Sequence, residues 1–134
     1  MKRIIAHFTF LLIPFICGAQ TQLQINIAAL KSLEQVEANM ETVLEQIKIE
    51  YASDSTFIKN LINSQKIWLT FRESELLVKY PNKLDESSVS ACVSLYLQSL
   101  TQERIKSLSI WLSGIPEGDI CIGSVKQKNK TNKK

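Results

Sequence analysis

Residues 30–51 read LKSLEQVEANMETVLEQIKIEY, and this stretch decides the fold. Its apolar residues recur every three or four positions, which is the period of one face of an α-helix. Most positions between them are polar or charged, and no glycine or proline interrupts the pattern. The stretch predicts an amphipathic helix over residues 29–51 whose core-facing side chains are Leu30, Leu33, Val36, Met40, Val43, Leu44, Ile47 and Tyr51.

A second helix is predicted over residues 56–79. Before it, Ser53 or Asp54 is suited to accept hydrogen bonds from the first N–H groups of the helix. Pro81 ends it, because proline disfavours the α conformation in the residue before it. The expected core side chains are Phe57, Leu61, Ile62, Trp68, Leu69 and Leu76, with Phe71 as a further candidate.

A third helix is predicted over residues 88–113. Asp85 and Ser87 are candidate caps at its start. Gly114 is expected to end it, with Pro116 two positions beyond. Its expected core positions are Val89, Cys92, Val93, Tyr96, Leu100, Ile105, Leu108, Trp111 and Leu112.

Three such helices joined by short connections must pack nearly antiparallel, since one amphipathic helix cannot hide its apolar face alone. No segment alternates with a period of two for long enough to indicate a strand. About 105 residues outside the two ends of the chain suffice for one core and not for two. The predicted fold class is therefore all-α, an antiparallel three-helix bundle over residues 20–125, with an extra turn near residues 24–27.

Residues 1–19 have the order of a secretory signal peptide. Lys2 and Arg3 precede an apolar run over residues 4–15, and small residues ending at Ala19 follow. The run is shorter than the roughly 20 apolar residues that a membrane span needs. We therefore expect export to the periplasm or the medium, cleavage near Ala19, and no transmembrane segment in the mature chain.

Cys17 offers an alternative, because a lipid-attachment cysteine would tether the protein to a membrane. Processing of that kind requires a small residue just before the cysteine. Residues 14–16 are Pro, Phe and Ile, so removal of Cys17 with the signal peptide is the favoured interpretation.

Positive charge is concentrated at the C-terminus, at Lys126, Lys128, Lys130, Lys133 and Lys134. Between Gln20 and Val125, 9 basic residues face 13 acidic ones, so the predicted domain is acidic. Residues 126–134 contain no apolar side chain to offset the entropy cost of ordering. They are predicted to form a disordered basic tail that serves solubility, and the alternative is contact with anionic lipid, nucleic acid or cell-wall polymer. We expect no nucleic-acid partner.

Two cysteines, Cys92 and Cys121, remain after removal of the signal peptide. An even pair in an exported chain is expected to form a disulfide, and the alternative is two buried thiols. Such a bond would link the third helix to the chain beyond it.

The mature chain lacks the usual residues of catalytic and metal sites. Its only histidine, His7, leaves with the signal peptide, which excludes Ser-His-Asp and Cys-His machinery and the familiar zinc sites. The acidic face of the first helix could hold a cation or act on a sugar, but glutamate-rich helix faces are usually solvated. We therefore predict no enzyme, no catalytic residue, no metal and no cofactor.

The densest local signal is the segment 64–75, SQKIWLTFRESE. On a helix, Gln65, Trp68, Arg72 and Glu75 fall on one stripe at spacings of three and four. Trp and Arg are common anchors of protein interfaces, so a recognition surface is one interpretation. The favoured one is structural: Trp68 lies in the core, and Arg72 covers it and reaches Glu41 or Glu45. Arg104, from a similar segment of the third helix, is likewise expected to be held inside the bundle by a carboxylate.

These two segments resemble the LprI-like lysozyme-inhibitor family. The matching residues are Ser64, Gln65, Trp68, Phe71, Arg72 and Glu73, followed by Leu100, Thr101, Arg104 and Leu108. Relatives commonly carry a cysteine pair at the positions of Leu76 and Tyr96, so an apolar contact between these two is expected to replace that cross-link. Near residues 37–44 the first-helix signature of the family is a degraded match.

The resemblance implies a small exported helical domain that binds a protein partner, with lysozyme as the partner of its inhibitory members. The predicted function is therefore a non-enzymatic binding protein of the bacterial envelope that inhibits a lysozyme. The alternative is a structural or assembly factor that docks on another envelope protein through the Trp68–Arg72 stripe.

Overall fold

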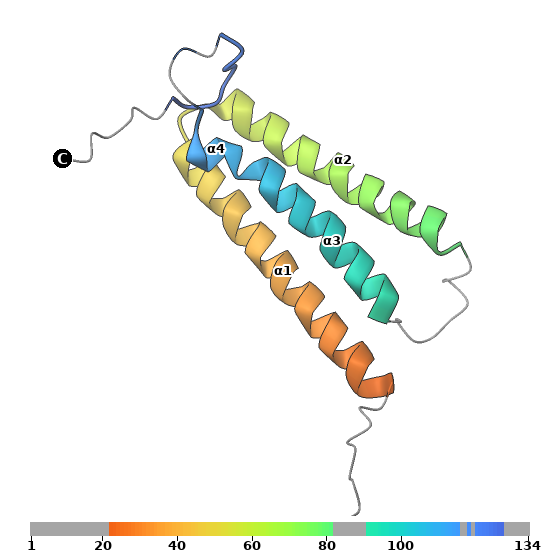
Figure 1. Cartoon of the computed structure of the whole chain (residues 1–134). Helices are drawn as coiled ribbons and strands as arrows, with labels where there is room; N and C mark the ends of the chain where they lie inside the picture. The colour runs from red at the N-terminus through yellow and green to blue at the C-terminus, as the bar shows by residue number, and fades with distance from the viewer. Residues whose placement is uncertain (1–21, 82–90, 116–117, 119, 128–134) are drawn as a thin grey trace, which may run out of the picture.

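In the part of the chain that the structure describes, the fold consists of three long helices and one short one. The computed structural model describes residues 22–81, 91–115, 118 and 120–127. Its helices are α1 (Gln22–Glu50), α2 (Ser55–Lys79), α3 (Ala91–Leu108) and the single turn α4 (Ile110–Ser113). Helix α2 runs antiparallel to α1 and α3 (Figure 1). The predicted all-α three-helix bundle is confirmed.

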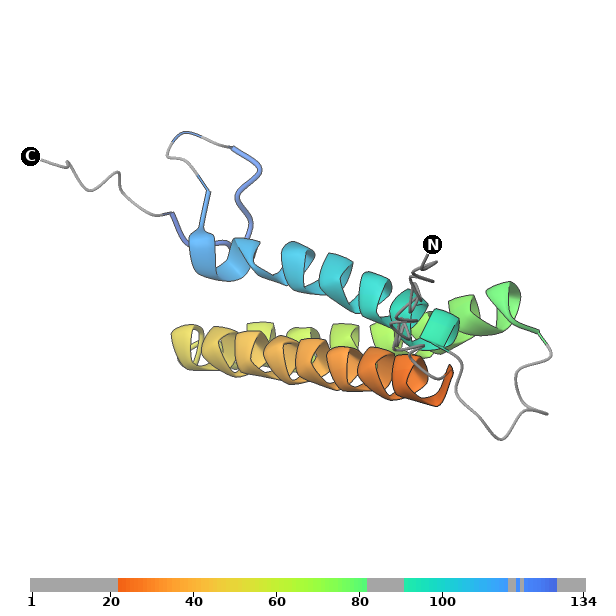
Figure 2. The same ribbon diagram turned by 60° about the horizontal axis from the view of Figure 1, so that its bottom comes forward.

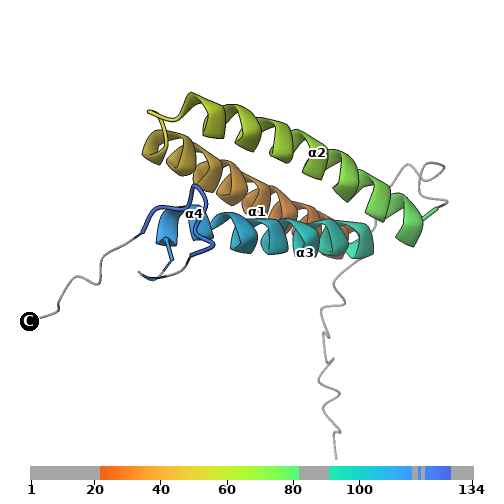
Figure 3. The same ribbon diagram turned by 90° about the horizontal axis from the view of Figure 1, so that it is seen from above.

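Packing between the helices is uneven. Helices α1 and α3 run in the same direction and lie close together along much of their length, whereas the backbone of α2 lies farther from both (Figures 1 and 3). Within the described residues, the β-structure is limited to an isolated parallel bridge between Ile115 and Gln127. None of the helices described has both the length and the apolar character needed to cross a bilayer.

Helix α2 begins and ends where the sequence predicts. At its start the Asp54 carboxylate accepts a hydrogen bond from the Phe57 backbone N–H at 2.8 Å. At its end Tyr80 has φ −132° and ψ 70°, outside the α region, as the following Pro81 requires. Gly114 ends α4 with φ 71° and donates its N–H to Ile110 O at 2.9 Å.

Helix α1 begins at Gln22, earlier than the predicted residue 29, and the residues of the expected extra turn belong to it. Its first turns are tied to α3, because the Asn26 side chain accepts a hydrogen bond from the Ala91 backbone N–H at 3.1 Å. Asn26 thereby satisfies a donor at the start of α3. The predicted caps Asp85 and Ser87, and also Val89, lie outside the described residues.

The core consists of two apolar clusters, one toward each end of the bundle. The larger contains Met40, Leu44, Ile47, Tyr51, Phe57, Leu61 and Leu108, with Trp68, Ile105 and Trp111 among the half-buried residues packed on it. The smaller contains Leu33, Leu76, Val93 and Leu97. Tyr96 packs against this second cluster, so Leu76 and Tyr96 belong to the same apolar region, as expected from the sequence.

Several residues predicted to be core are exposed, and some core residues were not predicted. Leu30, Ile62, Leu69, Phe71 and Cys92 are exposed. Ser94 and Thr101, by contrast, are fully buried. Some apolar residues are exposed because each helix carries more of them than its buried face can hold. Ser94 and Thr101 are buried because small side chains let α3 approach α1 closely.

The C-terminal segment lies beside α4, at the end of the bundle where α1 ends and α2 begins (Figure 2). There Tyr51 stacks on Phe57 at a ring-centroid distance of 4.1 Å, and Trp111 contacts both rings edge-on. The Tyr51 hydroxyl donates to Trp111 O at 3.2 Å and accepts from the Lys126 backbone N–H at 3.1 Å. Lys126, the first residue of the predicted tail, thus packs on the bundle and pairs with Glu50 at 3.1 Å. Residues 128–134 and the predicted signal peptide lie outside the described residues.

The predicted Cys92–Cys121 disulfide is not present, and neither cysteine is buried. Cys92 lies in the first turn of α3, whereas Cys121 follows α4, beyond the opposite end of α3. The length of α3 between them is roughly 24 Å at 1.5 Å per residue. A disulfide requires Cα atoms within about 7 Å of each other.

Both cysteines should therefore react with iodoacetamide in the native, non-reduced protein. Peptide mapping by mass spectrometry would show Cys92 and Cys121 each carrying the label. A linked peptide that contains both, and that disappears on reduction, would contradict the structure.

The cap on α2 gives a second prediction. Asp54→Ala should lower the free energy of unfolding by about 1 kcal/mol, because the Phe57 N–H loses its acceptor. Ser53→Ala, one position earlier, should change it by less than about 0.5 kcal/mol. Urea denaturation followed by circular dichroism measures both, and equal effects of the two variants would refute the capping role.

Candidate functional site

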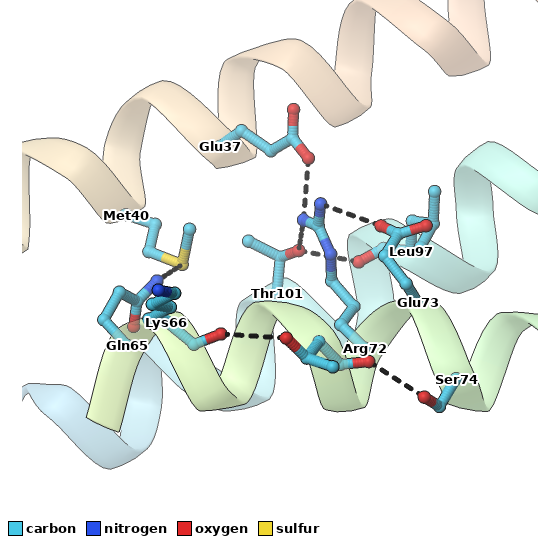
Figure 4. A network of polar contacts seen from close by, with 10 residues as sticks. Glu37, Met40, Gln65, Lys66, Arg72, Glu73, Ser74, Leu97 and Thr101 are labelled. Carbon is cyan, nitrogen blue, oxygen red and sulfur yellow. Dashed lines mark hydrogen bonds and ion pairs between the residues drawn. The ribbon is translucent and has the colours of Figure 1, made fainter. Parts of the chain in front are cut away.

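Two side chains of the 64–75 segment are buried in the middle of the bundle. Gln65 and Arg72 are each 9% exposed, and Trp68 between them is half-buried. Gln65 and Arg72 extend from α2 toward α1 and α3, in the space between the two apolar clusters (Figure 4). Together with Trp68, Glu37 and Thr101 they form the polar belt, the name used below for these five residues.

Arg72 joins the three helices. Its Nη1 donates to Glu37 Oε1 of α1 at 2.7 Å and to Thr101 Oγ1 of α3 at 3.2 Å. Thr101 Oγ1 itself donates to Leu97 O at 2.8 Å, so its lone pairs are left to accept from Arg72. One guanidinium therefore connects the helix that carries it to both neighbours.

The acidic partner of Arg72 is not the predicted one. We expected Glu41 or Glu45, and the structure places Glu37 there instead. Glu41 and Glu45 are exposed, and Glu45 pairs with Lys48 at 2.6 Å. Glu37 lies one turn before Glu41 and two turns before Glu45 on α1. Because glutamates recur at each turn, the sequence alone does not show which of them pairs with Arg72.

Gln65 and Ser64 hold Arg104 between α2 and α3. The Gln65 amide donates to Met40 Sδ at 3.4 Å and accepts from Arg104 Nε at 3.1 Å. Arg104 Nη2 donates to Ser64 Oγ at 3.1 Å. The carboxylate predicted to pair with Arg104 is not found, because none of the described residues places one within 4.0 Å of it. Partial burial lowers the pKa of Arg104 from its ordinary value.

Trp68 lies between the two arginines. The guanidinium carbons of Arg72 and Arg104 are 5.4 Å and 5.8 Å from its ring. These are cation–π distances, and such contacts gain strength when the groups are partly withdrawn from water. The indole thus links the buried Arg72 to Arg104, which lies nearer the surface.

Glu75, the last residue of the predicted stripe, lies outside the belt. It is half-buried near Tyr96 of α3. Partial burial raises the pKa of the Tyr96 phenol above its ordinary value, and the negative charge of Glu75 adds to this effect. The Lys79 ammonium stands 3.8 Å from the centroid of the Tyr96 ring.

A cleft of about 430 Å³ opens beside Arg104, between the start of α2 and the end of α3. Its walls come from α2, α3, α4 and the C-terminal segment, through Asp54, Thr56, Phe57, Asn60, Leu61, Ser64, Arg104, Ser107, Leu108, Trp111 and Ser124. Arg104 also lines a second hollow of about 200 Å³, together with Trp68, Phe71 and Leu100. The motif residues Ser64 and Arg104 therefore reach a concave surface.

Sequence reasoning did not identify most residues of this cleft. Asn60, Ser107 and Ser124 come from separate segments and form no local motif. Only Arg104 was a candidate before the structure, and Ser64 was part of the quoted motif. Among the described residues no group of three or more His, Cys, Asp or Glu could hold a metal ion.

Removal of the Arg72 side chain should destabilise the bundle. We expect Arg72→Ala to cost about 3 kcal/mol of unfolding free energy, because Glu37 and Thr101 lose their shared donor and Trp68 loses packing. Lys66→Ala removes an exposed cation from the same helix and should change it by less than about 0.5 kcal/mol. Urea denaturation measures both. A loss below about 1 kcal/mol for Arg72→Ala would show that the belt is not a main source of stability.

Comparison with known proteins gives one result that bears on the whole domain. No curated protein and no solved structure matches the chain. Residues 17–108, which include α1, α2 and α3, match the protein family described as lysozyme inhibitor LprI. The match covers more than half of the chain and contains every residue of the polar belt. The chain therefore belongs to the LprI family of lysozyme inhibitors.

Proposed function

We propose that the protein is exported and that it binds and inhibits a lysozyme without acting on any substrate. The observation that carries this proposal is the family match over residues 17–108. The signal-peptide pattern of residues 1–19 supports export, because lysozymes act on the cell wall outside the cytoplasm.

The charge of the surface supports a cationic partner. Glu34, Glu41 and Glu45 are exposed on α1 at spacings of seven and four residues, so they share one helix face. We call these three residues the acidic face. Complementary charge accelerates the encounter of two proteins, and lysozymes that are strongly cationic fit such a face. The buried belt residues Gln65 and Arg72 are unavailable for contact, so binding uses surface groups.

The test is the lysis of a peptidoglycan substrate by chicken-type, goose-type and invertebrate-type lysozymes, with and without the protein. The protein is purified after export from cells that express the full chain. We expect a stoichiometric loss of lysis with at least one type. The loss should weaken as salt is added, since screening shortens the reach of surface charges.

Two double variants with the same change in charge test the acidic face. Glu34→Gln with Glu41→Gln should weaken inhibition about tenfold at low salt. Glu50→Gln with Glu103→Gln removes two exposed glutamates from α1 and α3 outside the acidic face and should leave inhibition nearly unchanged. Equal weakening by both pairs would show that net charge acts without a defined face.

The alternative is an assembly factor that docks on another envelope protein. Arg72 is buried in the belt, so the Trp68–Arg72 stripe as a whole does not face solvent. Ile67 and Phe71 of the same segment, at 62% and 52% exposure, are the observation that favours a docking surface on α2. This function predicts co-purification with an envelope partner and no effect on lysis. No inhibition of any of the three lysozymes would overturn the first proposal in its favour.

A further inference from the structure

We infer that the cleft beside Arg104 is a binding site for a small saccharide that carries one carboxylate. The site is separate from the acidic face of α1, and the inference does not depend on inhibition of lysozyme. It rests on the positive charge and fixed orientation of the Arg104 guanidinium, on the residues that line the cleft, and on the position of Asp54 in the cleft.

Arg104 supplies the charge that a carboxylate would meet. Its guanidinium has five N–H donors, and hydrogen bonds to Gln65 and Ser64 use two of them. No carboxylate of the described residues lies within ion-pair distance of it. Gln65 and the Trp68 ring fix its orientation, at 3.1 Å and 5.8 Å respectively. A partly buried, oriented cation without an acidic partner that lines a cleft is suited to bind an anion.

The lining of the cleft indicates the rest of the ligand. The half-buried Trp111 offers aromatic surface, whereas Asn60, Ser107 and Ser124 offer amide and hydroxyl groups. This mixture suits a ring with apolar faces and hydroxyl groups around its edge, and it is too polar for an acyl chain. The volume, about 430 Å³, falls within the range of small-molecule sites.

Asp54 sets the direction in which the ligand lies. It lines the cleft at the start of α2, ten positions before Ser64. Ten helical residues span roughly 15 Å, so the Asp54 carboxylate and Arg104 mark opposite ends of the cleft. Asp54 repels a second negative charge and accepts hydrogen bonds from hydroxyl or amide groups. The cleft therefore favours one carboxylate at the Arg104 end over polyanions such as nucleotides.

Calorimetric titration of the exported protein with two sugars tests the inference. N-acetylmuramic acid and N-acetylglucosamine share one ring, and only the first carries a carboxylate. We expect N-acetylmuramic acid to bind at least about tenfold more tightly, as expected for one additional charge-assisted contact. Equal binding of the two sugars, or no binding of either, would overturn the proposal. So would binding of tetra-alanine in preference to both, since that result would assign the cleft to peptide termini.

Two matched variants locate the site without disturbing Arg104. Asn60→Asp places a negative charge on the wall of the cleft and should weaken binding of N-acetylmuramic acid about tenfold. Asn63→Asp makes the same change at an exposed position of α2 outside the cleft and should leave binding unchanged. Circular dichroism confirms that both variants are folded. Equal weakening by the two would show that the sugar does not bind in this cleft, whatever the lysis assay gives.

Discussion

A single buried guanidinium, that of Arg72, determines how the three helices meet. A charge taken out of water is strongly unfavourable unless it is paired and hydrogen-bonded. Glu37 on α1 and Thr101 on α3 accept from its Nη1 at 2.7 Å and 3.2 Å, and the Glu73 carboxylate of α2 lies 3.4 Å from its Nη2. The requirement is strictest for α3, because a shift by one turn would replace Thr101 with Leu97 or Ile105, whereas the same shift of α1 would bring another glutamate, Glu41, to Arg72. Apolar packing alone is far less selective about such shifts.

The rest of the core is arranged around this belt. Apolar clusters lie on both sides of it, and close packing of α3 on α1 depends on the small buried residues Ser94 and Thr101. Gln65 connects the belt to Arg104 by accepting a hydrogen bond from its Nε. Arg104 lies nearer the surface and lines the cleft. The polar residues of segment 64–75 and Arg104 thus act in two ways. Gln65 and Arg72 stabilise the bundle, and Ser64 and Arg104 shape a concave surface.

The helices could be predicted from the sequence because capping residues, proline and apolar spacing act on nearby residues. The contacts between helices could not be predicted in this way. Asp54 and Pro81 act on their own neighbours, so the bounds of α2 follow from the sequence. The early start of α1 depends on Asn26 and the backbone of Ala91, which are far apart in the chain. The choice of Glu37 over Glu41 depends on the register of two helices. The cleft is lined by four segments that are separate in the sequence, so no local motif indicates it. The disulfide prediction was wrong because an even number of cysteines says nothing about the distance between them.

The most direct test of this account is a double-mutant cycle between Arg72 and Glu37. Unfolding free energies of Arg72→Met, Glu37→Gln and the double variant would be measured by urea denaturation. If the ion pair holds α2 on α1, the two changes should be coupled by about 1–3 kcal/mol. Additive effects, within about 0.5 kcal/mol, would show that the pair does not hold these helices together and would contradict the account.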